Sequence, residues 1–490
     1  MTFASLLMRN KLKYLFTGAI IFFLLFEIIF SFRRHYYFPI DGDLPAIVLP
    51  DIHYQKVLND PFGLNVILKD SVYPAPNRFF VHWTMSNYFH RAPLFFQNFV
   101  SPIKSIYVAC GFAKTLIQFL LIYLLAIYIT GKRKIWAPDV LFASAIITPL
   151  FQVFGYNISM GIIDHSVTYT FFYAQALLLV VLFFLPFFNA AFQRHDFRFG
   201  KMTMVLLLLL SIILSFNGAL NTAIILIVCP VVFMYIFIRE FKKFDKENLT
   251  GRVMKSVKNI PKSMIYIFGF ACILCLYSLY VGKNNSENLW ETIPISERYE
   301  RLPHGLYLQF SENAGPLLLL AMIFINAVII KIHDKNDRAK QYLKMLTLFF
   351  ILSCVYILLL PLGGYRSYRP NIVRMDTIMP VTVGMILFYG FSTFYIIKHV
   401  LLKRKIIYYL IIIVFSGIFI QADTKLEKLN KCEQYAIKTL SRSTEEIILL
   451  DSDCTVMSWN LVKDYHDSEV KTELLRHWGI IEKKKYFYQK

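Results

Sequence analysis

Long apolar runs, separated by short polar and basic segments, recur along the whole chain. About 20 apolar residues in a helix cross roughly 30 Å of hydrocarbon, so each long run predicts a membrane-spanning helix. The pattern predicts an all-α polytopic membrane protein with about 11 transmembrane helices. The fifth run is short and could form an interrupted pair with the sixth. The expected spans are residues 13–32, 105–130, 137–155, 167–188, 202–217, 219–238, 263–281, 314–331, 345–362, 376–397 and 406–421.

The basic residues between these spans are unevenly distributed. With the N-terminus in the cytoplasm, the inside segments and their edges carry 26 Lys and Arg residues, and the short outside loops carry six. Such an excess is typical of cytoplasmic loops. Eleven crossings then place the C-terminus outside. We expect a membrane domain at 1–421, which contains a long first outside loop at 33–104, and a small outside domain at 422–490.

Composition supports the same class of protein. Hydrophobic residues make up 57% of the chain, and the mean hydropathy is +0.51. The net charge of +20 does not indicate a nucleic-acid partner, because the basic residues lie mainly in short loops where they set topology. Membrane lipids are the expected surroundings. The chain has no G-x-x-x-x-G-K-[ST] motif, which argues against an ATP-driven pump.

The first outside loop begins with two carboxylates, Asp41 and Asp43, that flank Gly42. Near the bilayer surface such a pair could bind a divalent cation (Mg²⁺ or Mn²⁺) through its oxygens, or supply a general base. A solvated turn would use the same residues. The rest of the loop is rich in aromatic residues and predicts short interfacial helices, which either anchor the loop or line a lipid chain.

A second outside loop carries Asp164 and His165 and has no Lys or Arg. An adjacent Asp and His could act as acid, base or metal ligand. The alternative is that Asp164 or Ser166 caps the helix that follows.

The loop between the ninth and tenth spans contains arginines where positive charge is least expected. A guanidinium pairs bidentately with phosphate or carboxylate, and Asp376 follows closely enough to orient one of them. We therefore expect an anion site, with a lipid phosphate as the natural anion at this depth. Salt bridges to other outside segments are the alternative. The candidate residues are Tyr365, Arg366, Tyr368, Arg369 and Arg374.

Other expectations concern charges inside spans and the tail. Glu27 and Lys114 are intramembrane charges that could pair between adjacent helices.

The sequence of the tail predicts a helix over 423–442, a strand over 446–450, and a helix end with a short strand over 474–481. Cys432 and Cys454 share the tail and could form a disulfide in an oxidising compartment.

This layout resembles the GT-C class of membrane glycosyltransferases, in architecture and over most of the chain. That class has a first helix followed by a long outside loop with an essential acidic residue, then many spans and an outside C-terminal part. The resemblance implies a polyprenyl-phosphate sugar donor. Asp41 or Asp43 would be the acidic element, and Asp164 with His165 a second acidic loop. Arg366, Arg369 and Arg374 would hold the lipid phosphate.

The D-G-D segment departs from the D-E pair of the protein mannosyltransferase and aminoarabinose transferase branches, which leaves the sugar and the metal requirement open. Together with the Phe-, Ile- and Lys-rich composition, the resemblance implies an enzyme of the bacterial inner membrane. Its N-terminus would be cytoplasmic, its C-terminus periplasmic, and its acceptor an envelope glycan or lipid. Two alternatives remain: an O-antigen polymerase or ligase, and a non-enzymatic lipid or polysaccharide transporter.

Overall fold

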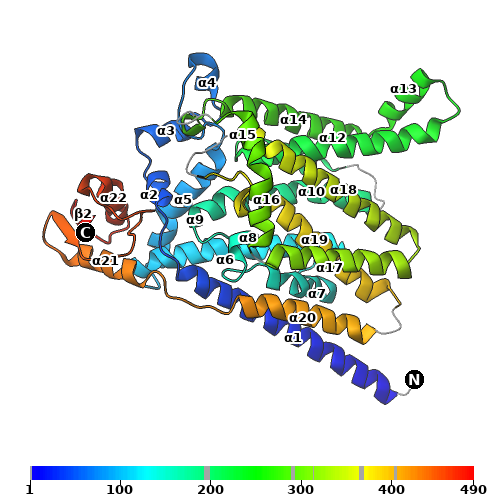
Figure 1. Cartoon of the computed structure of the whole chain (residues 1–490), viewed down its shortest axis with the longest axis horizontal. Helices are drawn as coiled ribbons and strands as arrows, with labels where there is room; N and C mark the ends of the chain where they lie inside the picture. Colours follow the sequence, from blue (N-terminus) through cyan, green and yellow to red (C-terminus); the bar gives the residue numbers. More distant parts are fainter. Residues whose placement is uncertain (1–2, 193–198, 289–292, 313, 364–368, 402–404) are drawn as a thin grey trace.

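The computed structural model describes residues 3–192, 199–288, 293–312, 314–363, 369–401 and 405–490. Within this part of the chain, long helices run side by side and a small α/β tail lies at one end of the bundle (Figure 1). Helix α1 (Phe3–Tyr36) begins at the opposite end from the tail. The two termini therefore lie at opposite ends, as an odd number of crossings requires.

In the described residues, nine helical segments are long and apolar enough to cross a membrane, and the protein is accordingly a multi-pass membrane protein. They correspond to nine of the eleven expected spans. The segment that follows the loop with Asp164 and His165 is continuous through α9 (Val167–Tyr169), η2 (Thr170–Gln175) and α10 (Ala176–Phe192). The other helices of this set are α1, α6 (Pro102–Thr130), α12 (Ala219–Phe241), α14 (Lys262–Gly282), α17 (Ala314–His333), α18 (Asp337–Leu359), α19 (Met375–His399) and α20 (Lys405–Ala422).

The other two expected spans are shorter helices. Helix α7 (Pro138–Ile147) continues only as the turn η1 (Thr148–Leu150), and α11 (Lys201–Ser215) has 15 residues. At 1.5 Å per residue α11 is about 22 Å long, which is less than the hydrocarbon thickness. The helical class is confirmed, whereas the count of 11 is confirmed only for the nine longer helices. With either count the crossings remain odd in number.

Helix ends follow local sequence signals. Pro102 and Pro138 stand in the first turns of α6 and α7, where the missing N–H costs nothing. Gly131 ends α6 with φ of 68°, a conformation that favours glycine. The Asn336 side chain accepts a hydrogen bond from Ala339 N at 2.8 Å and caps α18.

The core lies around α6 and α19, which are the most deeply buried of the long helices. Leu121 and Ala126 of α6 and Ile386 of α19 have no exposed surface. A polar network ties α17 to its neighbours: Asn326 Nδ2 donates to Ser392 Oγ at 2.9 Å, and Tyr408 OH donates to Asn326 Oδ1 at 2.9 Å. Because its members are satisfied by one another, this network serves helix packing.

The charges inside the spans are arranged differently from the expected pair. Lys114 Nζ donates to the carbonyl of His165 at 2.6 Å, and Glu27 lies near Arg34, so the predicted pair of Glu27 and Lys114 is wrong. Arg34 instead forms a buried ion pair with Asp423, which joins the end of α1 to the start of the tail. The sequence did not suggest that pair.

The long loop after α1, residues 33–104, folds into helices, as predicted. They are α2 (Asp43–Val48), α3 (Ile52–Asn59), α4 (Leu64–Lys69) and α5 (Phe79–Phe96), all near the tail end of the bundle (Figure 1). The remaining helical elements are α8 (Asn157–Met160), η3 (Lys242–Phe244), α13 (Leu249–Asn259), η4 (Ser286–Asn288), α15 (Ile295–Glu300), α16 (Leu302–Ser311) and η5 (Leu360–Leu362).

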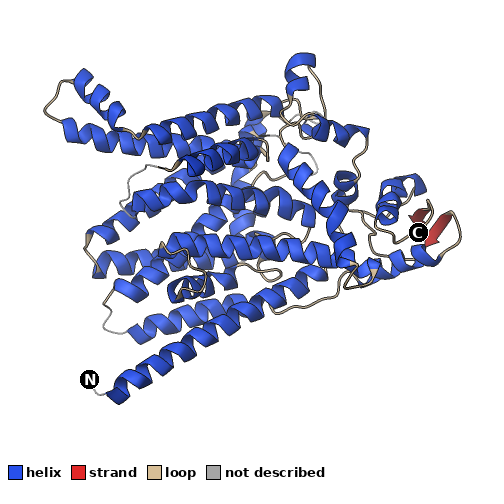
Figure 2. Cartoon of the chain, turned by 180° about the vertical axis from the view of Figure 1, so that it is seen from behind, coloured by secondary structure: helices blue, strands red, loops and turns tan. Residues whose placement is uncertain are grey.

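The tail combines helices with a two-stranded sheet, seen as the only strands in Figure 2 for the described residues. Its elements are α21 (Lys431–Arg442), β1 (Ile447–Leu450), η6 (Tyr465–Ser468), α22 (Glu469–His477) and β2 (Tyr486–Gln489). The strands are parallel, with Ile447 opposite Tyr486. The first strand is confirmed. The helix starts later than predicted, at Lys431, and the second strand lies beyond 474–481 because Gly479, with φ of 66°, ends α22.

Candidate functional site

Asp41 is a buried carboxylate whose oxygens are fully engaged. Its Oδ1 accepts from Thr168 Oγ1 at 2.7 Å, Leu44 N at 3.0 Å and Asp43 N at 3.2 Å. Its Oδ2 accepts from Ser166 Oγ at 2.7 Å and Thr168 N at 3.0 Å. Asp41 therefore fixes the first loop against the start of α9, and with five donors it has little capacity left to take a proton from a substrate.

Asp43 is held in a different way. Its Oδ1 accepts one hydrogen bond, of 2.9 Å, from the indole Nε1 of Trp459 in the tail. Burial raises the pKa of Asp43, the Trp459 N–H opposes that rise, and Arg369 also lowers it. Asp43 thus faces the tail and the arginine loop together.

Asp164 and His165 are adjacent in the sequence, and both line a cavity. Ser166 N donates to Asp164 Oδ1 at 2.7 Å, and Ser166 Oγ accepts from Tyr169 N as the cap of α9. Burial raises the pKa of Asp164 to about 6, opposed by the Ser166 N–H and by the Lys114 ammonium. Asp164 can therefore exchange a proton near neutral pH.

His165 is mainly a structural residue. Its ring stacks on Phe38 with centroids 4.2 Å apart, and its Nε2 lies 2.8 Å from the carbonyl of Val153. Burial and, to a smaller extent, the Lys114 ammonium lower the pKa of His165 to about 4, so the ring is neutral at physiological pH. A neutral ring that donates Nε2–H to a carbonyl orients the loop beside Asp164.

The arginine loop is partly defined. Arg374 forms a bidentate pair with Asp376, through Nε to Oδ1 at 2.9 Å and Nη2 to Oδ2 at 2.8 Å. Arg369 contacts the same carboxylate, with Nη1 at 3.3 Å from Oδ2, and its guanidinium also contacts the hydroxyl of Tyr169. Tyr365, Arg366 and Tyr368 lie outside the described residues.

Tyr169 connects the arginines to the tail. The Arg369 guanidinium lies over the Tyr169 ring at 4.9 Å, and the ring stacks on Trp459 with centroids 5.6 Å apart. Contacts therefore run from Asp43 through Trp459 and Tyr169 to the arginines. No sequence motif marks Tyr169 or Trp459 as a site residue, because Tyr169 lies in an apolar helix and Trp459 in the tail.

Two cavities meet at the arginine pair. Each has a volume of about 540–550 Å³, and Arg369, Arg374 and Asp376 line both. The first, here called the basic cavity, lies among α5, α10, α12, α14 and α19 and is also lined by Arg78, Lys283 and Arg298. The second, here called the mixed cavity, is also lined by Asp164, His165, Glu312, Tyr169 and Trp459.

The two cavities differ in charge. Five cationic side chains and one carboxylate line the basic cavity, whereas two arginines and three carboxylates line the mixed cavity. The basic cavity suits an anionic ligand, and the mixed cavity suits a neutral, hydroxyl-rich one. A reacting group at the shared arginines would be accessible from both sides.

A divalent cation on Asp41 and Asp43 does not fit these surroundings. The oxygens of Asp41 already accept five hydrogen bonds. Over the described parts of the chain, the one group of three His, Cys, Asp or Glu side chains close enough to share a metal ion is Cys432, Asp453 and Cys454. There the two sulfur atoms are joined to each other. The arrangement therefore does not favour Mg²⁺ or Mn²⁺ at Asp41.

A buried glutamate in the tail contacts three parts of the site, and no sequence motif identifies it. Glu433 Oε2 accepts from Ile40 N at 2.9 Å and Tyr107 OH at 2.8 Å, and Oε1 accepts from Met457 N at 2.8 Å. One carboxylate thus joins the start of the D-G-D segment, α6 and the loop that carries Trp459.

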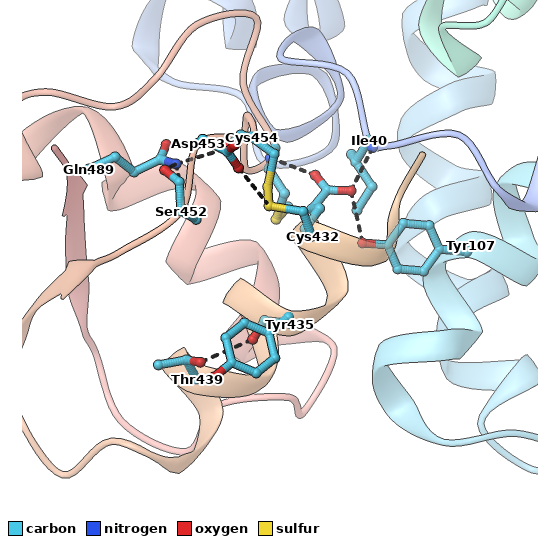
Figure 3. The surroundings of a disulfide bond; sticks show 11 residues. Ile40, Tyr107, Cys432, Tyr435, Thr439, Ser452, Asp453, Cys454 and Gln489 are labelled. Carbon is cyan, nitrogen blue, oxygen red and sulfur yellow. Dashed lines mark hydrogen bonds between the residues drawn. A yellow bond between two sulfur atoms is a disulfide. The ribbon is translucent and has the colours of Figure 1, made fainter. Parts of the chain in front are cut away.

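The disulfide between Cys432 and Cys454 lies directly beside this carboxylate. Figure 3 shows it between α21 and the following loop, with Ile40 and Tyr107 across from it. The disulfide that these two cysteines could form, a question that the sequence left open, is therefore present. It closes the loop that carries Trp459 onto the helix that carries Glu433.

Comparisons with known proteins do not assign this arrangement to a family. The sequence has no significant match among protein-family models or curated proteins, and the fold has none among solved structures.

Proposed function

We propose that this protein transfers a sugar from a polyprenyl-phosphate donor to a glycan or lipid acceptor, on the periplasmic face of the bacterial inner membrane. The observation that carries the proposal is that the pair Arg369 and Arg374 lines both the basic cavity and the mixed cavity. A group transfer needs an anion site for the leaving group and a base for the acceptor. The arginines and Asp164 are suited to these two roles.

The donor would lie in the basic cavity with its phosphate against the arginines. That cavity also has an apolar wall, which includes Phe172, Leu177 and Ile224. An amphiphile with an anionic head matches this combination of cationic and apolar lining. The acceptor would lie in the mixed cavity, where the stacked rings of Tyr169 and Trp459 offer a flat wall to a sugar ring.

In the proposed reaction, an acceptor hydroxyl oxygen forms a bond to the anomeric carbon. The bond from that carbon to the phosphate oxygen breaks, and its electron pair leaves on the phosphate. Arg369 and Arg374 stabilise this developing negative charge, and the acceptor proton passes to Asp164. Asp41 acts as a positioning residue because it orders the start of α9 beside Asp164. No step in this scheme requires a metal ion.

The test compares strains that lack the gene with strains that express variants of it. Envelope glycans and lipids are analysed by mass spectrometry for a lost sugar. Wild type restores the sugar and Asp164→Asn does not. Asp51→Asn, which changes an exposed carboxylate in the first loop, serves as the matched control and restores it.

The outcomes separate the parts of the proposal. An unchanged glycan profile in the deletion strain would rule out glycosyl transfer. Full restoration by Asp164→Asn would rule out Asp164 as the base. Accumulation of an intact lipid-linked glycan on the cytoplasmic side would favour the transporter alternative.

A further inference from the structure

The basic cavity contains more positive charge than one phosphate needs. Arg369 and Arg374 share Asp376, so this trio contributes only one net positive charge. Arg78, Lys283 and Arg298 line the same cavity and add three more. Arg298 is held by the carbonyls of Ile293 and Gly363, each at 2.9 Å, which fix its position without neutralising its charge.

Arg78 is the cation best placed to accept a second anionic group. Within the described residues its guanidinium makes no ion pair, and its aromatic neighbour is Phe172, with the ring centroid 5.7 Å away. Arg78 precedes α5, whereas Arg369 and Arg374 precede α19, so the three approach the cavity from different elements. An anion with two separate charged groups could contact both sides.

Two carboxamides at the turn between α11 and α12 point to the same ligand chemistry. Asn217 and Asn221 line the basic cavity, and only 3% and 2% of their surfaces are exposed. Neither Nδ2 has a hydrogen-bond acceptor among the described residues. A buried unpaired donor is unfavourable, and a phosphate oxygen within reach would supply the missing acceptor. Gly218, with φ of 122°, allows the turn that presents both side chains.

We infer that the basic cavity binds the head group of a lipid diphosphate rather than a lipid monophosphate. One phosphate lies against Arg369 and Arg374, and the other lies against Arg78, with Asn217 and Asn221 as donors. This inference rests on the proposed function, since it specifies the donor of the same site. The leaving group of the transfer would then be a lipid diphosphate, which carries the electron pair of the broken bond.

The test measures binding to the purified full-length protein in detergent. The ligands tested are farnesyl diphosphate, farnesyl phosphate and inorganic diphosphate. Their binding is measured by thermal stabilisation and by calorimetry. We expect the lipid diphosphate to bind about 10-fold more tightly than the monophosphate, because its second phosphate adds a charge-assisted contact. A 10-fold difference corresponds to about 1.4 kcal/mol. Inorganic diphosphate, which lacks the apolar chain, should bind least tightly.

Variants locate the second phosphate. Arg78→Gln and Asn221→Leu should weaken binding of farnesyl diphosphate by about 10-fold and of farnesyl phosphate by less than about threefold. Arg91→Gln, at an exposed position in helix α5, which Arg78 precedes, is the matched control and should change neither. Equal affinities for the two lipids, or an equal loss for both in Arg78→Gln, would overturn the inference. Tightest binding of inorganic diphosphate would assign the cavity to a soluble anion.

A failure of this inference can be distinguished from a failure of the proposed function. Asp164 lies in the mixed cavity, so Asp164→Asn should leave both lipid affinities unchanged while it abolishes transfer. Preferred binding of the diphosphate, with no glycan change in the deletion strain, would retain the head-group assignment and reject glycosyl transfer. Equal binding of both lipids, with a lost sugar in the deletion strain, would retain glycosyl transfer and reject the head-group assignment.

Discussion

Trp459 donates its indole N–H to Asp43 at 2.9 Å, although 416 residues separate them in the chain. The bond joins the tail to the D-G-D segment of the first loop. The same indole ring stacks on Tyr169, which contacts Arg369. The tail is therefore part of the candidate site, and a change in the tail should alter the site directly.

Replacing Trp459 with phenylalanine tests this contact, because the ring can still stack on Tyr169 while the N–H donor is lost. We expect the tail to dock less stably by about 1 kcal/mol and to be cleaved faster in limited proteolysis. The pKa of Asp43 should rise, since the Trp459 hydrogen bond lowers it. Trp136→Phe, at an exposed ring far from the tail, is the control. Unchanged cleavage in Trp459→Phe would show that the bond contributes nothing.

The disulfide provides a second test, which also reports on topology. Cys432 and Cys454 are 22 residues apart, and a link that closes such a loop stabilises a fold by about 3 kcal/mol. We expect reductant, or Cys432→Ser with Cys454→Ser, to make the tail protease-sensitive. In intact cells the two thiols should react with maleimide only after reduction, as expected in an oxidising compartment. The free thiol of Cys354 is removed by Cys354→Ser as a control. Reaction before reduction would place the tail inside.

The sequence predicted those features that depend on nearby residues. Apolar runs mark the nine long helices, because each run alone satisfies the length and hydropathy of a crossing. Helix α7 is shorter than its apolar run suggested, since Pro149 leads into an irregular segment. Helix α11 covers almost all of its run, which is itself short and ends at the tight turn of Phe216. Arg369 and Arg374 were found because they lie in a loop where positive charge is least expected, and their partner Asp376 is close in sequence.

The roles of the acidic residues could not be predicted in this way. Asp41 is saturated by Ser166 and Thr168, whereas Asp43 meets Trp459, and these partners lie more than 120 residues away. A D-G-D motif alone does not show which distant residues will form hydrogen bonds with its two carboxylates. Glu433 is similar, since nothing around it in the tail sequence indicates that it binds the first loop.

Glu433 makes the docking of the tail depend on pH. Burial raises the pKa of its carboxyl from 4.5 to about 7, so the folded state binds this proton more tightly than the unfolded state. The resulting stabilisation is complete below about pH 4.5 and is lost as the pH rises through about 7, a loss of about 3 kcal/mol. Protease resistance of the tail should therefore decrease between about pH 5 and pH 8.

Glu433→Gln isolates this effect, because the amide cannot ionise. In that variant the protease resistance should vary little over the same range. Glu445→Gln, at an exposed position in the tail, should keep the wild-type dependence. A wild-type dependence in Glu433→Gln would assign the pH effect to another group.

The final prediction concerns Asp164 as a base. A general base must be ionised, so transfer should increase with pH through about 6, the pKa of Asp164, and then level off. Label transfer from lipid to glycan in isolated membranes gives the pH profile. Asp164→Asn should lower the rate by about 100-fold or more and remove this dependence.

A substitution at Lys114 tests whether Asp164 is the group whose ionisation produces this pH profile. Its side chain is 1% exposed, its Nζ contacts the His165 carbonyl at 2.6 Å, and its charge lowers the pKa of Asp164. In Lys114→Met the pKa of Asp164 should rise, so the acidic limb of the profile should move to higher pH while the rate at high pH changes less. Lys104→Met, at an exposed position on the same helix α6, should leave the limb in place. A limb that stays near pH 6 in Lys114→Met would mean that the titrating group lies elsewhere, because the Lys114 ammonium lowers the pKa of Asp164 in the wild type.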